Sequence, residues 1–360
     1  MTLALAALVS CGRGEDAWGL QDNPADRILL KDYRPKSVFN VPVTLVEKAK
    51  YPVIDMHTHD YVGTKEEVAS VVDLMDKAGI EVGHIMHCNW IGEPFDVVVE
   101  KYSGYKDRFR FWCCIDYTGF GQDDWADRAI AELERCREMG AVGIGELGDK
   151  GLGDMYARPV EGKGIRLNDP KLRPVLAWAA EHGWPVSVHI AEPIWMYEAV
   201  DERNDGLMNG AKWQVDTTVE GCMGYDRLME MFEDAVASNP NTIFIADHLL
   251  NMSHDLTRLG RLMDKYRNLY VDISGRFSES SVTPRATRAF MLKYQDRILY
   301  GTDNTPSESM YAHTFRIMET ADEHIYSDDS YHWALSGWDL PDSVLKKIYR
   351  DNALGLMSGK

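Results

Sequence analysis

Eight short apolar runs, separated by longer segments with helical patterning, constrain the fold of this chain most. The runs are Val53–His57, Gly83–His87, Phe109–Ile115, Ala141–Glu146, Pro185–Ile190, Thr242–His248, Leu269–Ile273 and Ile298–Asp303. Apolar strands that alternate with helices are typical of βα units and of a parallel sheet buried on both faces. The pattern predicts an α/β fold, a (β/α)8 TIM barrel spanning residues 51–360.

Helical segments fill the gaps between these strands. Thr64 and Glu67 have the spacing of a capping box at the start of a helix over Lys65–Ala78. The other expected helices are Asp124–Met139, Pro170–Glu181, Tyr225–Ala237, Asp255–Tyr266 and Pro284–Tyr294. A doubly wound open sheet is the alternative, but its first strand is usually followed by a glycine-rich phosphate loop. Here that turn reads His57-Thr-His59-Asp60, so we expect the barrel.

Two connections are longer than ordinary loops, at residues 147–168 and 191–223. Long βα loops of a barrel lie over its active site. The second loop carries Trp195, Tyr197 and Trp213. We expect these aromatic side chains either to form a wall of the substrate pocket or to hold the loop down.

Composition restricts the class of function. The chain has 360 residues, of which 45% are hydrophobic, enough for a sizeable core. Its formal charge of −18, with no basic run, argues against a nucleic-acid partner and leaves a small-molecule substrate as the expectation. The six cysteines include no C-x-x-C pair, which argues against a structural zinc module or a thioredoxin-like redox site.

The N-terminus resembles the end of a bacterial lipoprotein signal. An apolar run from Leu3 to Val9 precedes Ser10-Cys11-Gly12. We expect residues 1–11 to be a signal peptide, Cys11 to carry a lipid anchor, and residues 12–50 to be a tether and irregular arm. The protein would then be exported, to the periplasm or to a membrane surface. The alternative is a cytoplasmic protein with an apolar N-terminus, because the run is short and no basic residue precedes it.

Polar residues follow the apolar runs where a barrel places its catalytic groups. The first strand ends in His57-x-His59, and the period of two points both imidazoles to one side. His189 follows the fifth strand, His248 the sixth and Asp303 the eighth. One histidine at a strand end is usually a packing residue, but a barrel brings all five groups to one mouth. The pattern predicts a divalent metal site.

At these residues the chain resembles the amidohydrolase superfamily, in particular its amidohydrolase-related (amidohydrolase 2) branch of metal-dependent hydrolases. The likeness spans about residues 50 to 357 and lies in Val53-Ile-Asp-Met-His-Thr-His59, Pro185-Val-Ser-Val-His189, Ile245-Ala-Asp-His248, Tyr300-Gly-Thr-Asp303 and the closing segment Leu340–Asn352. The resemblance implies four metal ligands, His57, His59, His189 and Asp303. It also implies a catalytic or supporting role near the substrate for His248.

Glu146 ends the fourth strand, where some members of that superfamily place a bridging carboxylate. Metal ligation by Glu146 and a structural ion pair are both open interpretations. The site would hold one or two divalent ions. Imidazole and carboxylate ligands suit Zn2+ best and tolerate Mn2+ or Fe2+.

The expected reaction is hydrolysis of a C–N or C–O bond in an amide, lactone or ester. A bound divalent ion lowers the pKa of its water to roughly 7. Asp303 would take up the water proton, and His248 would stabilise the oxyanion. Non-oxidative decarboxylation on the same fold is the alternative, and a non-catalytic binding barrel is a third interpretation.

Three further residues are candidate substrate contacts: Arg276, Trp90 and Trp195. The Arg276 guanidinium could hold a substrate carboxylate, or it could be a local salt-bridge partner in an acidic protein. Trp90 follows the second strand and Trp195 lies in the second long loop. The sequence leaves a homo-oligomer open.

Overall fold

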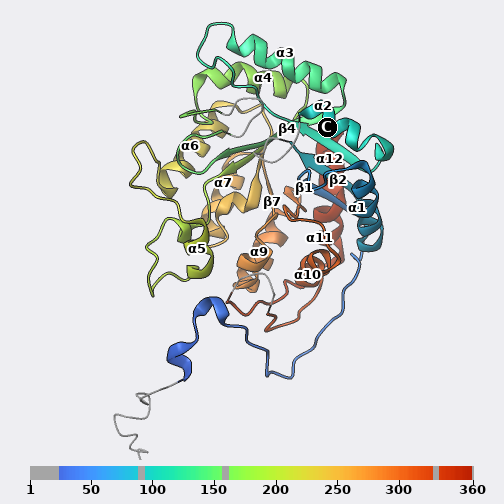
Figure 1. The fold of residues 1–360 in the computed structure, drawn as a ribbon, viewed down its shortest axis with the longest axis vertical. Coiled ribbons are helices and arrows are strands. Elements are labelled where there is room, and N and C mark those ends of the chain that lie inside the picture. The colour runs from blue at the N-terminus through green and yellow to red at the C-terminus, as the bar shows by residue number, and fades with distance from the viewer. Residues whose placement is uncertain (1–23, 88–93, 156–161, 327–331, 359–360) are drawn as a thin grey trace, which may run out of the picture.

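Eight parallel strands form a barrel with helices around it (Figure 1). The computed structural model describes residues 24–87, 94–155, 162–326 and 332–358. Hydrogen bonds from Met56 N to Tyr300 O (2.9 Å) and from Asp303 N to His57 O (2.8 Å) join the two ends of the sheet. The strands pair in chain order: β1 (Val53–Thr58), β2 (Ile80–Met86), β3 (Phe109–Cys113), β4 (Ala141–Asp149), β5 (Val186–Ile190), β6 (Phe244–Ala246), β7 (Leu269–Asp272) and β8 (Ile298–Leu299). The predicted (β/α)8 barrel is confirmed.

The helices lie between successive strands and after the last one. They are α1 (Lys65–Ala78), α2 (Phe95–Lys101), α3 (Trp125–Glu138), α4 (Arg173–Glu181), α5 (Leu207–Trp213), α6 (Tyr225–Ser238), α7 (Leu256–Lys265), α8 (Phe277–Ser281), α9 (Pro284–Tyr294), α10 (Glu308–Glu319), α11 (Asp342–Lys346) and α12 (Asn352–Met357). The capping box of α1 forms as predicted: Glu67 N donates to Thr64 Oγ1 at 3.2 Å, and Thr64 N donates to Glu67 Oε2 at 3.3 Å.

Two apolar clusters hold the layers together. The larger one fills the space between the sheet and the surrounding helices. The smaller one lies inside the barrel, where Met56, Trp112 and Leu299 from three strands pack with Ala353 and Leu356 of α12. A filled interior is typical of this fold, in which the active site lies at the carboxyl-terminal mouth.

Four strands, β3, β6, β7 and β8, are shorter than predicted because the backbone leaves the ladder early, whereas β2 and β4 are longer. Residues predicted to extend the sixth strand to His248 instead form a turn, in which His248 to Asn251 all have positive φ. A left-handed backbone cannot continue a strand. In β1 the register shifts between Asp55 and Thr58. This shift lets Met56 pack inside the barrel while the adjacent His57 reaches the mouth.

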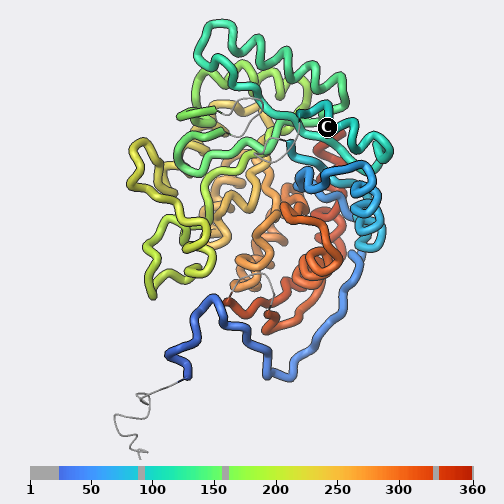
Figure 2. The backbone as a smooth tube through the Cα atoms, in the orientation of Figure 1, coloured from blue at the N-terminus to red at the C-terminus, as the bar shows by residue number. Residues whose placement is uncertain are grey.

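Residues 24–50, the described part of the predicted tether and arm, are irregular. They form two short 3-10 helices, η2 (Pro24–Arg27) and η3 (Leu30–Asp32), followed by extended chain that runs along the outside of the barrel (Figure 2). The predicted signal peptide and Cys11 lie outside the described residues. In the described ranges, no helix is long and apolar enough to cross a membrane.

Candidate metal centre

The metal-compatible residues predicted from the sequence meet at the carboxyl-terminal mouth of the barrel. Each comes from the end of a strand or from the segment that follows it: His57 and His59 (β1), Glu146 (β4), His189 (β5), His248 (after β6) and Asp303 (after β8). All but Asp303, whose side chain is 28% exposed to the mouth, are buried.

Two of the imidazoles are held through one nitrogen and present the other to the site. His57 Nδ1 lies 2.8 Å from Asp272 Oδ2. His59 Nδ1 lies 3.0 Å from the carbonyl oxygen of Met86. Because a carbonyl oxygen and an ionised carboxylate only accept hydrogen bonds, each Nδ1 carries a proton. Nε2 is therefore the nitrogen of each ring that can bind a metal ion, once it carries no proton.

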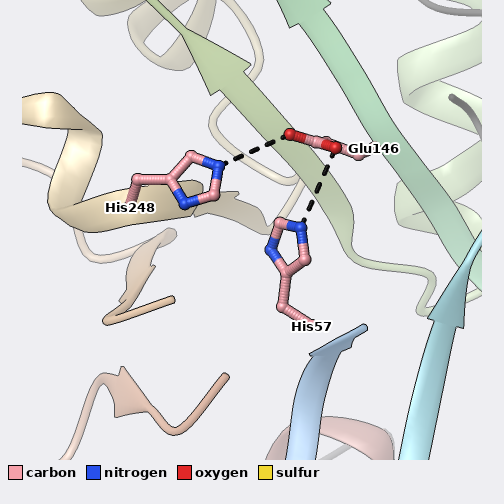
Figure 3. A group of neighbouring side chains, drawn as sticks. All are labelled: His57, Glu146 and His248. Atoms are coloured by element: carbon pink, nitrogen blue, oxygen red, sulfur yellow. Dashed lines mark ion pairs between the residues drawn. The ribbon is translucent and has the colours of Figure 1, made fainter. Parts of the chain in front are cut away.

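His248 is anchored in the same way. Its Nδ1 lies 2.9 Å from the carbonyl oxygen of Ser274, and its Nε2 faces the site. Figure 3 shows that His248 and His57 each face a different carboxylate oxygen of Glu146. The Nε2 atom of His248 lies 3.6 Å from Glu146 Oε1 and 3.7 Å from Asp303 Oδ2.

The carboxylates of Glu146 and Asp303 complete a cluster with the first two histidines. Asp303 Oδ1 is 3.0 Å from His59 Nε2 and 3.9 Å from His57 Nε2. Glu146 Oε2 is 3.5 Å from His59 Nε2 and 3.8 Å from His57 Nε2. Ligand atoms at about 2.1 Å from a common ion lie roughly 3 to 4 Å apart, so these spacings fit a metal ion. In the described chain, no hydrogen-bond partner reaches the buried Nε2 of His57, as expected of a ligand atom.

His189 lies beside this cluster, between two carboxylates. Its Nδ1 is 2.7 Å from Glu146 Oε1, and its Nε2 is 3.7 Å from Glu192 Oε2. Burial disfavours the imidazolium form, but the two carboxylates raise the pKa of His189 to about 9. Among the described residues, three groups have ligand atoms close enough to share an ion: His57, Glu146 and His248; His57, His59 and Asp303; and His57, Asp247 and Asp272. His189 is in none of them, and metal ligation by His189 stays a prediction.

Two buried aspartates under the site were not found from the sequence. Asp272 accepts hydrogen bonds from His57 Nδ1, His248 N (2.7 Å) and Ser274 Oγ (2.7 Å). Burial opposes its ionisation, yet the charge of His57 lowers its pKa to about 2. Asp247 accepts from Ser187 Oγ at 2.7 Å, and burial raises its pKa to about 7. Their positions in the sequence could have indicated them, since Asp272 ends the seventh strand and Asp247 directly precedes His248.

The backbone around His248 fixes its position. His248 has φ +61°, and three more left-handed residues follow it. Asn251 closes this turn by donating from Nδ2 to the carbonyl oxygens of Ile190 (3.1 Å) and Ala191 (2.9 Å). Positive φ costs free energy at residues other than glycine, so these hydrogen bonds offset a local strain.

A cavity of about 380 Å3 opens over the cluster. Its lining includes both long loops: Lys150 from the first, and Glu192, Met196, Asn209, Lys212 and Trp213 from the second. Glu192 is buried and forms an ion pair with Lys150. The sequence held one signal for Glu192, its position three residues after His189 in a strand-end segment.

Arg276 also lines the cavity, but protein groups surround its guanidinium. Nε and Nη2 donate to Asn251 Oδ1 at 2.9 and 2.6 Å, and Nη1 donates to Gly275 O at 2.8 Å. Glu279 Oε2 lies 3.3 Å from Nε. This arrangement supports the salt-bridge interpretation of Arg276, and substrate binding by it remains a prediction.

Of the two tryptophans expected at the substrate, Trp195 lies among the described residues and packs away from the cavity. Trp195 is buried against Trp333, with ring centroids 5.5 Å apart, and does not line the cavity. Met196 and Trp213 of the same loop line it instead. Trp90 lies outside the described residues.

Comparisons with known proteins agree with this fold. The profile of the protein family described as Amidohydrolase matches residues 54–356. A comparison with curated protein sequences finds no match.

Solved structures similar to this chain include three decarboxylases. The 2,6-dihydroxybenzoate decarboxylase from Rhizobium is 17% identical, with a TM-score of 0.55 over 86% of this chain and 99% of that one. Dihydroxybenzoic acid decarboxylase from Polaromonas sp. JS666, with bound manganese, is 16% identical, with a TM-score of 0.53 over 86% and 97%. The 5-carboxyvanillate decarboxylase from Novosphingobium aromaticivorans, complexed with manganese, is 14% identical, with a TM-score of 0.51 over 88% and 100%. At these identities the likeness establishes the fold.

Proposed function

The chain belongs to the amidohydrolase family, and we propose that it is a metal-dependent enzyme that decarboxylates a small aromatic carboxylic acid without oxidation. The observation that carries the metal assignment is the convergence of His57 Nε2 and His59 Nε2 on the carboxylates of Glu146 and Asp303. These four residues would hold one divalent ion. When bound, such an ion supplies Lewis-acid polarisation of substrate oxygens.

The choice of decarboxylation over hydrolysis is supported by the solved structures of similar fold, several of which are named as decarboxylases of aromatic acids. The cavity, at about 380 Å3, is of the size that single-ring ligands occupy. Two of those structures contain manganese, so Mn2+ is the first ion to test, with Zn2+ second.

In decarboxylation the bond between the ring carbon and the carboxyl carbon breaks, its electron pair stays on the ring, and the ring carbon takes up a proton as CO2 leaves. Asp303 is the candidate group that delivers this proton because its carboxyl group is partly exposed to the cavity. Burial opposes its ionisation, but His59 and His57 hold its pKa below the usual range, so Asp303 would relay a proton taken from water. His248 Nε2, 3.7 Å from Asp303 Oδ2, faces the same space and can orient the substrate or relay the proton.

Hydrolysis of an amide, ester or lactone is the second candidate. It is favoured by the same two residues, since Asp303 beside the ligand cluster could accept a proton from water and His248 could stabilise an oxyanion. The two reactions therefore share their groups and differ in the bond that breaks.

The test uses the full chain loaded with Mn2+ or Zn2+ in separate samples. One panel holds 2,6-dihydroxybenzoate and 5-carboxyvanillate, the substrates named for the similar structures, and related hydroxybenzoic acids. The other holds aryl amides, esters and lactones. Release of CO2, with one deuterium in the ring from D2O, supports decarboxylation, whereas release of amine or alcohol from the second panel overturns it in favour of hydrolysis. Asp303→Asn is the negative control.

A further inference from the structure

The N-terminal arm, residues 24–46, exposes an unusual amount of apolar surface. Seven large apolar side chains in this arm are exposed, as many as in all the rest of the described chain: Ile28, Leu29, Tyr33, Val38, Phe39, Val43 and Leu45. Val38 and Leu45 are 91% and 81% exposed. Clustered exposed apolar residues mark a surface that binds something.

The arm is attached to its own barrel at one short stretch. Thr44 donates from N and from Oγ1 to Asp322, both at 2.7 Å. Closer to the N-terminus, Ser37 Oγ lies 3.1 Å from His324 Nδ1, and Phe39 packs edge-on against the same ring. The preceding helices η2 and η3 contain no buried residue, and Figures 1 and 2 show this part of the arm leading away from the barrel.

The exposed part of the arm is basic, although the whole chain is acidic. Residues 27–36 contain four basic residues and one acidic residue, a net charge of +3 in a chain of −18. Lys31, Arg34 and Lys36 are exposed, and no carboxylate of the described chain lies within ion-pair distance of them. A binding surface for this segment should be acidic and partly apolar.

The loop after β5 offers such a surface. Residues 198–220, here called the acidic rim, contain six acidic and two basic residues, a net charge of −4. The rim also exposes Val200 (47%), Trp213 (54%) and Val219 (45%). It therefore has both properties that complement the arm.

A lipid bilayer is a poorer fit for the arm than a protein surface. Pro35 and Pro42 interrupt the segment, and from Tyr33 to Val46 the backbone is not helical. A non-helical backbone leaves its N–H and C=O groups unpaired, which is costly in hydrocarbon but not against a protein edge or loop.

We propose that the arm of one copy of this chain docks on the acidic rim of a second copy, and that the exchange is reciprocal in a two-fold dimer. Because Lys212 and Trp213 of the rim line the cavity, the docked arm lies beside the mouth of the partner's site. The inference is independent of which reaction the enzyme catalyses.

Sedimentation velocity of the full chain over a range of concentrations tests the proposal. The wild type is expected to dimerise. The arm variant Lys31→Glu/Arg34→Glu/Lys36→Glu and the rim variant Glu198→Lys/Glu202→Lys/Glu220→Lys should each weaken the dimer by at least about tenfold, because like charges then face each other. An equimolar mixture of the two variants should dimerise again, since in that pair both arm and rim contacts are complementary.

The control variant Arg137→Glu/Arg173→Glu/Arg261→Glu changes the charge by the same amount at exposed positions on α3, α4 and α7 and should leave the dimer intact. A wild-type monomer at all concentrations overturns the proposal, as does a dimer indifferent to the arm variant. If the arm variant and the rim variant are each monomeric and their equimolar mixture also fails to dimerise, the assignment of the docking surface to the rim is wrong. A bilayer is identified as the partner instead if the wild type is monomeric and sediments with vesicles of equal parts phosphatidylcholine and phosphatidylglycerol, whereas the arm variant does not sediment with them.

Discussion

The Nδ1 atom of His57 lies 2.8 Å from Asp272 Oδ2, and this contact decides which nitrogen of the ring faces the candidate metal centre. Asp272 is in turn held by the backbone N–H of His248, at 2.7 Å. One buried carboxylate therefore orients residues from two different strand ends, and its removal should affect the site without touching a ligand.

Asp272→Asn should lower metal affinity by roughly 10- to 100-fold, as substitutions of groups that orient a ligating histidine usually do. The amide can still accept from His248 N through its oxygen, but its NH2 group then faces His57 Nδ1. His57 would adopt the tautomer that blocks Nε2. Metal affinity is measured by competition with a chelating dye.

Asp264→Asn is the matched control, because Asp264 lies on the surface of α7 and pairs with Lys293. It should bind metal as the wild type does. An unchanged affinity in Asp272→Asn would show that Asp272 does not position His57.

His248→Asn should retain metal and lose about 10²- to 10⁴-fold in kcat, the usual range for a group that handles protons or stabilises charge. Asparagine tolerates the φ of +61° at this position, so the turn should survive. His254→Asn, at an exposed histidine outside the cluster, is the control. Metal content and turnover are measured on the same samples, and a parallel loss of both would make His248 a ligand.

Gly301→Ala should destabilise the protein by about 1 to 3 kcal/mol and weaken metal binding, because overpacking in a rigid site displaces its neighbours. An added Cβ would lie 2.8 Å from the Cβ of His57 and 3.2 Å from that of Ser274. Urea denaturation gives the stability change, and chelator competition gives the metal affinity.

Gly355→Ala is the control for Gly301→Ala. Nothing lies within 4 Å of its added Cβ, and the residue is inside α12, so alanine should raise stability by about 0.5 to 1 kcal/mol. If Gly301→Ala behaves like Gly355→Ala, the contact with His57 is not restrictive.

The fold and most of the candidate site were predictable because both depend on strand periodicity. Eight apolar runs predicted eight strands, and the polar residues that follow them converge because parallel strands of a barrel share one mouth. The rings of His57 and His59 lie side by side at the end of β1, with centroids 5.2 Å apart, as their spacing predicts.

The residues that orient the ligands were harder to find. Asp272 and Asp247 occupy strand ends, but nothing in a single sequence distinguishes a carboxylate under a site from one at its surface. The left-handed turn from His248 to Asn251 contains no glycine, so no local signal marked the early end of β6. Which aromatic residues of the 191–223 loop line the cavity depends on tertiary packing, as with Trp195 and Trp213.

His84 should make stability depend on pH below neutrality. It is buried in β2 and accepts a hydrogen bond from Trp112 Nε1 at 2.9 Å. Burial, with a smaller contribution from Arg110, lowers its pKa to about 3. The unfolded chain, with a histidine pKa near 6.5, takes up the proton first as the pH falls. Stability is therefore complete above about pH 6.5 and declines on acidification toward pH 3.

His84→Asn keeps an acceptor for Trp112 but cannot take up a proton. Between pH 7 and pH 5.5 the wild type should lose about 1.3 kcal/mol more stability than this variant, which follows from the two pKa values of His84. Urea denaturation of both proteins at the two pH values measures the difference, and other titrating groups cancel because they are common to both. Parallel losses in the two proteins would mean that His84 is protonated in the folded state at pH 5.5, and hence that water or a counter-charge reaches it inside the barrel.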